Sequence, residues 1–255
     1  MKVSIIGVGN MGTIFAEKLS EEADKLILVE KDLKKVSKFK TSPFELGDIE
    51  KAKKSDVIIV AVKPQNVREV LRDLEGFAGI LISIVAGLKI SEIEEYGIKK
   101  IVRVMPNVAV RVSAGVLAVS FSEELSKEEK EKVKKMLSKL GFVLEIEENL
   151  FPAITALTGS GPAFIFVLLE SFIDAAVKMG IPFEKAKKLV YKLFEGSVKL
   201  VSETDEHPAV WKHRVTSPAG TTIEGIVTME RLAVRGGMIE TLLSSHRKAC
   251  ELEGN

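Results

Sequence analysis

The chain has 255 residues, of which 46% are hydrophobic and 29% are charged, and its formal net charge is +1. This composition predicts a globular protein with a substantial core, and the near-neutral charge argues against bulk attraction to nucleic acid. The single cysteine, Cys250, cannot form an internal disulfide, and the sequence opens on the strand-like KVSIIG without a charged, apolar leader. We therefore predict a cytoplasmic protein with no nucleic-acid partner.

Short β-branched segments alternate with charged helical segments from the start of the chain. Strands are predicted at KVSIIG, KLILVE, DVIIVAV, GILISIVAG, KIVRVMP, GVLAVSF and FVLEIEE, with helical segments such as MGTIFAEKLSEE, NVREVLRDLEGF and KEEKEKVKKMLSKLG between them. This alternation is typical of βαβ units and a mainly parallel, buried sheet. We assign residues 1–149 to a doubly wound α/β domain.

The segment IIGVGNMG places Gly7, Gly9 and Gly12 in G-x-G-x-x-G spacing between the first strand and the next helix. The first glycine allows a tight turn, the second lets a pyrophosphate approach the backbone, and the third allows close packing of helix on strand. Asn10 and Met11 begin the helix, whose free N–H groups favour an anion. The segment predicts a dinucleotide site in a domain of the Rossmann type.

The end of the second predicted strand leaves the choice of dinucleotide open. Glu30 lies where an acid usually receives the ribose hydroxyls of NADH. However, Lys31, Lys34 and Lys35 follow directly, and they either meet the 2'-phosphate of NADPH or form a solvated helix face. The predicted cofactor is therefore NADPH or NADH.

A third segment, AVKPQN, follows the strand DVIIV. Its residues Ala61, Val62 and Lys63 therefore lie at the carboxyl edge of the predicted sheet, where open α/β sheets bind ligands. Lys63 is expected either to hold a phosphate or to cap the loop. We include all three residues in the predicted cofactor site.

Beyond Asn149 the strand pattern ends, and apolar residues recur at helical spacing through FIFVLLESFIDAAVKMG, EKAKKLVYKLFEGSVKLVSE and GIVTMERLAVRGGMIETLLSSHRKACELE. We assign residues 150–255 to an all-α domain. Polar residues interrupt its most apolar stretch, residues 153–179, so we interpret this stretch as a buried helix and predict no membrane span. A helical domain this apolar is expected to pack against a second copy.

The histidines do not suggest a metal site. His207, His213 and His246 are scattered along the chain, and no cysteine or carboxylate cluster accompanies them. Zinc sites need such ligands in close spacing. No metal is therefore predicted.

The segment VTSPAGTTIEG sets several hydroxyls and small residues before a helix predicted to begin near Thr221. An ordinary N-cap needs one of Ser217, Thr221 or Thr222, not all three together with an Ala-Gly pair. Free backbone N–H groups and hydroxyls converge at this helix start. The segment therefore predicts an anion site.

Six segments in one order resemble pyrroline-5-carboxylate reductase, which makes proline by reducing a cyclic imine with NAD(P)H. They are GVGNMG, AVKPQ, RVMPN, TALTGSGPAF, VKMGIP and VTSPAGTTIEG. The resemblance covers essentially the whole chain and implies an α/β Rossmann domain followed by an all-α dimerisation domain. It also implies a homodimer, or a higher oligomer of dimers, in which the helical domain of one subunit completes the site on its partner.

The resemblance further implies roles for particular residues. Ser217 and the amides around Gly220 and Thr221 would hold the substrate carboxylate, and the Thr222 hydroxyl would lie beside the ring nitrogen. Ser217 and Thr222 are thus the candidate catalytic residues. The residues implied to line the nicotinamide side are Ala86, Met105, Pro106 and Asn107.

Three positions depart from the family pattern. Ala219 stands where relatives usually carry a second glycine, so its methyl is expected to restrict the backbone or narrow the carboxylate pocket. Val108 and Ala109 follow the MPN segment where threonine and proline are common. Glu30 stands where many relatives have a polar or basic residue for NADPH.

Several other functions fit part of the pattern. β-Hydroxyacid dehydrogenases share the architecture but use a lysine on the long interdomain helix, and ALTGSGPAFIFVLLESFIDAAV contains none. That absence favours an imine over an alcohol as the substrate. A coenzyme F420-dependent NADP reductase would not explain the hydroxyl-rich loop. A related cyclic-imine reductase and a non-catalytic dinucleotide-sensing protein remain as alternatives.

Overall fold

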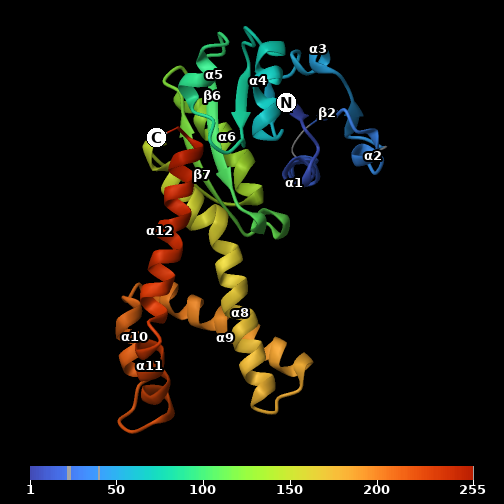
Figure 1. Cartoon of the computed structure of the whole chain (residues 1–255). Helices are drawn as coiled ribbons and strands as arrows, with labels where there is room; N and C mark the ends of the chain where they lie inside the picture. The colour runs from blue at the N-terminus through green and yellow to red at the C-terminus, as the bar shows by residue number, and fades with distance from the viewer. Residues whose placement is uncertain (22–23, 40, 255) are drawn as a thin grey trace. The chain divides into compact units, whose positions relative to one another are not determined.

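The computed structural model describes residues 1–21, 24–39 and 41–254. They form two compact units, one made of residues 1–162 together with the segment from 245 onward, and the other of residues 163–244. Figure 1 shows the chain coloured from its N-terminus to its C-terminus. The last strand of the chain ends at Glu145, and the compact units divide after Pro162 and before Ser245, so the boundary after residue 149 stays a prediction.

The first unit is built on an eight-stranded sheet with the strand order β3-β2-β1-β4-β5-β6-β7-β8. Neighbouring strands are parallel except β6 and β7, which are antiparallel. The short β3 was not predicted from the sequence. The strands are β1 (Lys2–Ile6), β2 (Lys25–Val29), β3 (Phe44–Leu46), β4 (Val57–Val60), β5 (Ile80–Ser83), β6 (Ile101–Pro106), β7 (Gly115–Phe121) and β8 (Gly141–Glu145).

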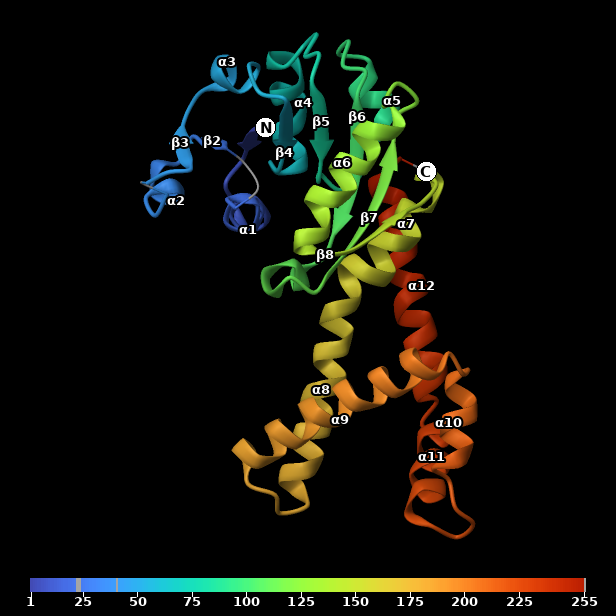
Figure 2. The ribbon, with the colours of Figure 1, turned by 180° about the vertical axis from the view of Figure 1, so that it is seen from behind.

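Helices cover both faces of this sheet (Figures 1 and 2). Because side chains alternate along a strand, Val57 and Ile59 of β4 pack with α1 and α6 on one face, while Ile58 and Val60 pack with α4 and α5 on the other. The helices and 3-10 turns of this part are α1 (Asn10–Leu19), α2 (Leu33–Val36), α3 (Ile49–Ala52), α4 (Pro64–Asp73), α5 (Ile90–Glu94), η1 (Val108–Val112), α6 (Lys127–Leu137), η2 (Ser138–Leu140) and η3 (Glu148–Leu150).

The strand order creates a switch point between β1 and β4. From β1 the chain continues to β2 on one side, whereas the strand on the other side of β1 is β4. The loops that leave the carboxyl ends of these two strands therefore diverge, which leaves room for a ligand between them. The glycine turn follows β1, and the segment Ala61, Val62, Lys63 follows β4.

The remaining elements are helical throughout the described residues, as the sequence predicted. The last helical run divides in two because Ala233 adopts a left-handed conformation with a φ of 52°. The helix predicted near Thr221 begins at that residue. These elements are α7 (Phe151–Ile154), the π-helical turn η4 (Thr155–Ser160), α8 (Gly161–Lys178), α9 (Phe183–Thr204), α10 (Pro208–Arg214), α11 (Thr221–Arg231) and α12 (Val234–Leu252).

The apolar helix α8 is largely exposed in the single chain. Ile165, Phe166 and Val167 are 46%, 58% and 63% exposed. The helical stretch Glu148–Lys178 is long and apolar enough to cross a membrane by length and composition, and only 11% of its most apolar window is buried. Our interpretation of this stretch as a buried helix is therefore wrong for the isolated protomer, because the rest of the described chain does not cover it.

Candidate functional site

The glycine turn after β1 is shaped by contacts that leave no room for side chains at two positions. Gly7 has a left-handed φ of 92°, and a Cβ there would lie 2.8 Å from the carbonyl oxygen of Ala61. A Cβ on Gly12 would lie 1.9 Å from the carbonyl oxygen of Gly7. A Cβ on Gly9, in contrast, would meet no described heavy atom within 4 Å. Two glycines are thus needed for the turn itself, and the middle one faces open space.

Two helix N-termini meet this space. α1 begins at Asn10 behind its N-cap Gly9, and α4 begins at Pro64 behind its N-cap Lys63. Neither N-cap side chain makes a capping hydrogen bond, and neither first turn carries an acidic residue. The α1 N-terminus therefore presents free N–H groups, and each of the two N-termini carries about half a positive charge, although Pro64 has no N–H and the Asn66 amide bonds to the Lys63 carbonyl. The open space at Gly9 and these N–H groups fit the pyrophosphate of a dinucleotide.

The carboxylate of Glu30 is tied to the same turn. Its Oε2 accepts a hydrogen bond from the Val8 amide at 2.8 Å, its Oε1 accepts one from the Asp32 amide at 3.0 Å, and the Lys35 Nζ lies 3.6 Å from Oε1. Burial acts to raise the pKa of Glu30, but the amide hydrogen bonds and the ammonium group outweigh it and lower the pKa. Glu30 is therefore an anion at neutral pH, and the stability it contributes is lost as the pH falls through its lowered pKa.

The lysines beyond Glu30 do not converge on one point. Lys31 pairs with Glu69, with 3.0 Å between Nζ and Oε1, whereas Lys35 lies beside Glu30. Lys34 is exposed on the short helix α2. Glu30 is therefore a negative charge that two backbone amides fix at this strand end.

The segments implied to line the nicotinamide side also lie at the carboxyl edge of the sheet. Ala86 is exposed in the turn after β5. Met105 is only 7% exposed and packs in a core cluster. The Oδ1 of Asn107 accepts hydrogen bonds from the Ala109 and Val116 amides, both at 3.2 Å. The side chains of Met105 and Asn107 thus shape the first unit, and Ala86 is the exposed member of this set.

The predicted substrate residues lie together in the second unit, between α10 and α11. Gly220 donates its N–H to the carbonyl oxygen of Ser217 at 3.2 Å, and a Cβ on Gly220 would lie 2.3 Å from the Ser217 Oγ. Thr221 and Thr222 are the first residues of α11, whose N-cap Gly220 has no side chain to cap it. Three hydroxyls, those of Ser217, Thr221 and Thr222, and the amides of a helix start therefore lie within six residues of the chain.

Ala219 takes a strained conformation in this loop. Its φ is 54°, in the left-handed region that glycine enters freely. An L-residue there costs about 1–2 kcal/mol. The methyl group that we expected to restrict the loop thus does not keep Ala219 out of a backbone conformation that suits glycine better.

The structure places the two sets of predicted residues in different compact units. Gly7 to Gly12, Glu30, Ala61 to Lys63 and Ala86 lie in the first unit, and Ser217 to Thr222 lie in the second. Among the described residues, no group of three or more His, Cys, Asp or Glu side chains is arranged to hold a metal ion.

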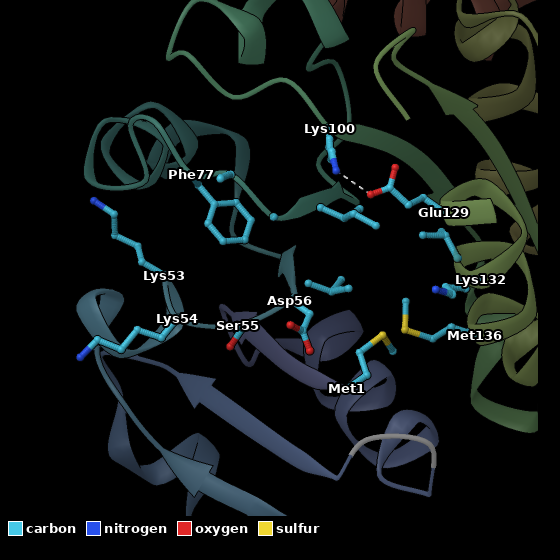
Figure 3. A pocket seen from close by; sticks show the side chains of 15 residues that line it. Met1, Lys53, Lys54, Ser55, Asp56, Phe77, Lys100, Glu129, Lys132 and Met136 are labelled. Carbon is cyan, nitrogen blue, oxygen red and sulfur yellow. Dashed lines mark hydrogen bonds and ion pairs between the residues drawn. The ribbon is translucent and has the colours of Figure 1, made fainter. Parts of the chain in front are cut away.

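A cavity of about 670 Å³ lies at the amino ends of the strands, opposite the carboxyl ends where the glycine turn lies (Figure 3). Asp56 and Gly79, which precede β4 and β5, line it together with Met136 of α6. The ion pair between Lys100 and Glu129, with 2.6 Å between Nζ and Oε1, lies in its wall. Within the described part of the chain, the cavity lining includes none of the predicted site residues. It therefore plays no part in the site at the glycine turn.

Comparison with known proteins identifies the family. Residues 148–252 match the family model for pyrroline-5-carboxylate reductase dimerisation. A pyrroline-5-carboxylate reductase of Aquifex aeolicus is 41% identical over 99% of this chain and 97% of its own length. The chain belongs to the pyrroline-5-carboxylate reductase family.

Further comparisons concern the first part of the chain and the whole fold. Residues 2–87 match the model for the NADP oxidoreductases that are coenzyme F420-dependent. A Plasmodium falciparum pyrroline carboxylate reductase solved with NADP bound has a TM-score of 0.89 and 27% identity, covering 99% of this chain and 98% of its own. A Streptococcus pyogenes 1-pyrroline-5-carboxylate reductase has a TM-score of 0.89 and 28% identity, covering 98% of both chains. The predicted fold class, a Rossmann-type sheet followed by a helical dimerisation domain, is confirmed.

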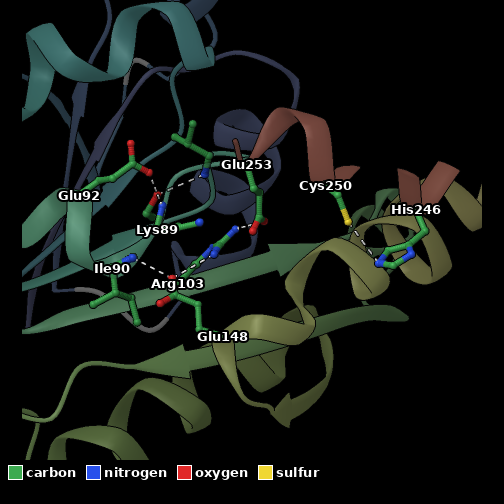
Figure 4. Close-up of polar contacts among 10 residues, drawn as sticks. Lys89, Ile90, Glu92, Arg103, Glu148, His246, Cys250 and Glu253 are labelled. Atoms are coloured by element: carbon green, nitrogen blue, oxygen red, sulfur yellow. Dashed lines mark hydrogen bonds and ion pairs between the residues drawn. The ribbon is translucent and has the colours of Figure 1, made fainter. Parts of the chain in front are cut away.

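Sequence reasoning missed one buried ionic cluster in this pyrroline-5-carboxylate reductase family member. Arg103, in the middle of β6, is only 1% exposed and pairs with Glu148 and Glu253 (Figure 4). A charged residue inside the otherwise apolar strand IVRVMP was the available signal, because arginine is rarely fully buried unless paired. The sequence did not indicate which carboxylates would pair with it.

The glycine turn yields a test that separates folding from binding. Gly12→Ala should lower the free energy of unfolding by about 1–3 kcal/mol, because the new Cβ overlaps the Gly7 carbonyl. Gly9→Ala should lower it by less than about 1 kcal/mol, since its Cβ enters open space, yet weaken dinucleotide binding at least about tenfold. Urea unfolding without ligand and titration with ADP-ribose measure the two effects. An unchanged affinity of Gly9→Ala for ADP-ribose would show that the pyrophosphate does not bind at this turn.

Proposed function

We propose that this chain reduces the C=N bond of 1-pyrroline-5-carboxylate to give L-proline, with NADPH or NADH as the reductant, in the last step of proline biosynthesis. Two relatives named pyrroline-5-carboxylate reductase align with this chain over 97% and 98% of their own length. The structural observation that carries the proposal is the loop before α11, where Ser217 lies against Gly220 at an uncapped helix start. Such a loop is suited to binding a carboxylate. A protein that bound only a dinucleotide through its sheet would not need this second site.

The proposed roles divide the substrate between two groups of atoms. The Ser217 hydroxyl and the amides around Gly220 and Thr221 hold the carboxylate, and the Thr222 hydroxyl lies beside the ring nitrogen. When bound, the dinucleotide would supply a hydride to the imine carbon. The C=N π electrons move to the nitrogen, which keeps the proton it already carries and becomes the amine of proline. The residues of this chain thus act by positioning a substrate that is already electrophilic.

The proposed dinucleotide site uses the turn from Gly7 to Gly12 and the segment from Ala61 to Lys63 for the pyrophosphate. The N–H groups at Asn10 and Met11 and the α4 N-terminus supply the positive potential. Glu30 lies where the adenosine ribose is bound in this fold. Its anionic, amide-anchored carboxylate supports NADH over NADPH, because a 2'-phosphate there would meet a like charge.

We further propose that the helical segment pairs with a second copy to form a soluble, cytoplasmic homodimer. The exposed apolar side chains of α8 and α9 support this, among them Phe166 at 58% and Leu189 at 59%. The charged Glu170 and Asp174 within α8 oppose a membrane location, since carboxylates inside a bilayer are costly. The matched family model is itself described as a dimerisation region. In the proposed dimer, the helical segment of one protomer completes the site of its partner.

The reaction is tested by the loss of nicotinamide absorbance with pyrroline-5-carboxylate, using NADH and NADPH in parallel. Ser217→Ala should raise the substrate KM about tenfold or more, through the loss of a hydrogen bond to a charged group. Thr222→Ala should lower kcat about tenfold, and Thr222→Ser, which keeps the hydroxyl, should retain most of it. Cofactor binding without turnover in the wild type would indicate a sensing protein, and turnover only with another imine would indicate a related reductase.

The cofactor preference is tested by Glu30→Gln. The amide keeps an oxygen to accept a backbone hydrogen bond but removes the negative charge, so the ratio of kcat/KM for NADPH to that for NADH should rise about tenfold. Glu17→Gln serves as the control, because Glu17 is an exposed residue of α1 that pairs with Lys38. An unchanged ratio in Glu30→Gln would show that Glu30 does not face the ribose.

The homodimer is tested by sedimentation velocity. The wild type should sediment as a dimer or a multiple of it, and Phe166→Glu should dissociate it because a buried unpaired carboxylate is costly. Leu33→Glu is the matched control, since Leu33 is 68% exposed on α2 and outside the proposed interface. A monomeric wild type, or one that pellets with lipid vesicles, would contradict the proposal.

A further inference from the structure

The buried guanidinium of Arg103 lies between two carboxylates that are far apart in the sequence. Its Nη1 donates to the Glu148 Oε1 at 3.0 Å, and its Nη2 donates to Glu253. The Glu253 side chain is 5% exposed and that of Glu148 is 30% exposed. The guanidinium also stacks on the Phe151 ring, with 4.2 Å from Cζ to the ring centroid. All four residues belong to the first compact unit.

Both carboxylate segments contact the loop that follows β5. The Glu148 Oε1 that pairs with Arg103 also accepts the Ile90 amide at 2.8 Å (Figure 4). On the other side, a Cβ on Gly87 would lie 2.9 Å from the carbonyl oxygen of Leu252, the residue before Glu253. At Ile90 the loop is thus bonded to Glu148. At Gly87 it packs closely against Leu252, the neighbour of Glu253.

The residue just before Gly87 is Ala86, the exposed residue implied to line the nicotinamide side. Gly87 has a left-handed φ of 77°, so the course of the chain at Ala86 depends on this turn. Arg103 does not lie at the surface where a ligand could reach it, since only 1% of its side chain is exposed. Any effect it has on the cofactor must therefore pass through the segments that it holds.

We propose that Arg103 is a positioning residue for the nicotinamide end of the cofactor site: through Glu148 and Glu253 it clamps the loop from Gly87 to Ile90 from two sides, and this sets the position of Ala86. The proposal depends on the proposed function and on the role in the nicotinamide wall that the family resemblance implies for Ala86. The glycine turn and Glu30 serve the adenosine half, and among the described residues no hydrogen bond or ion pair joins them to this cluster.

The two halves of the dinucleotide can be probed separately. ADP-ribose carries the adenosine and pyrophosphate but no nicotinamide, so it reports on the glycine turn alone. NADH reports on both halves. The ratio of their dissociation constants therefore isolates the nicotinamide end, and it does not depend on turnover or on the fraction of folded protein.

Glu253→Gln is the main variant, because it keeps the size of the side chain and removes its charge. It should raise the dissociation constant for NADH about threefold to tenfold while leaving that for ADP-ribose unchanged, and it should lower kcat with pyrroline-5-carboxylate by a similar factor. Glu251→Gln is the matched control two residues away, where Glu251 pairs with Lys248 at 2.7 Å on the surface. Arg103→Lys, which keeps the charge but loses the two-pronged donor, should change the ratio in the same direction.

The outcomes are distinct. Equal changes for NADH and ADP-ribose, or no change for either, would overturn the positioning role and leave Arg103 with a purely structural one. If Arg103→Lys fails to fold, as judged by circular dichroism, Glu253→Gln alone decides. If the ratio changes as expected but the wild type does not reduce pyrroline-5-carboxylate, the proposed reaction fails while the positioning role stands. If the wild type binds NADPH more tightly than NADH, the two dissociation constants are measured for NADPH and 2'-phospho-ADP-ribose instead.

Discussion

A positive charge in the middle of the sheet is the constraint on which much of this structure depends. The guanidinium of Arg103 is buried in β6, and an unpaired ion in such a place costs several kcal/mol. Its partners come from Glu148, just before the long helical segment, and from Glu253, just after it. Removing one member of a buried pair typically costs about 3–5 kcal/mol. The residues that precede and follow the helical part of the chain, Glu148 and Glu253, thus both pair with one side chain of the sheet.

The two compact units share one local feature at their proposed anion sites. In each, a turn of small residues leads into a helix whose N-cap is a glycine: Gly9 before α1 and Gly220 before α11. A glycine N-cap has no side-chain oxygen, so the first amides of the helix stay free for a ligand. The units differ in what surrounds the turn. The first adds a second helix N-terminus at Lys63, and the second adds the hydroxyls of Ser217 and Thr222.

The sequence predicted the fold class because its signals are local. The strand-helix alternation, the glycine spacing from Gly7 to Gly12 and the helix start at Thr221 each depend on neighbours within a few residues. The left-handed Ala219 departs from the usual residue preference, so its conformation was not predicted. The short strand β3 and the break at Ala233 were not predicted either, because neither carries a strong local pattern.

Non-local features were beyond the sequence pattern. The pairing of Arg103 with Glu253 depends on how the chain folds back, and the abundant glutamates gave no way to choose among them. The exposure of α8 was predicted wrongly, because an apolar helix has the same sequence whether its own chain or another molecule covers it. For the candidate site, the sequence predicted which residues lie near each other at the glycine turn, and it did not predict that Glu30 bonds to Val8.

The pairing of Arg103 also sets an order of events during synthesis. Glu253 leaves the ribosome 150 residues after Arg103, once the whole helical segment has been made. Domains generally fold as units during translation, beginning with the N-terminal one. Here the sheet is complete in sequence at β8, but its buried cation still lacks one of its two carboxylates. The buried ion pairs of the first unit are therefore completed only after the end of α12 has been made, although this unit is the first to be translated.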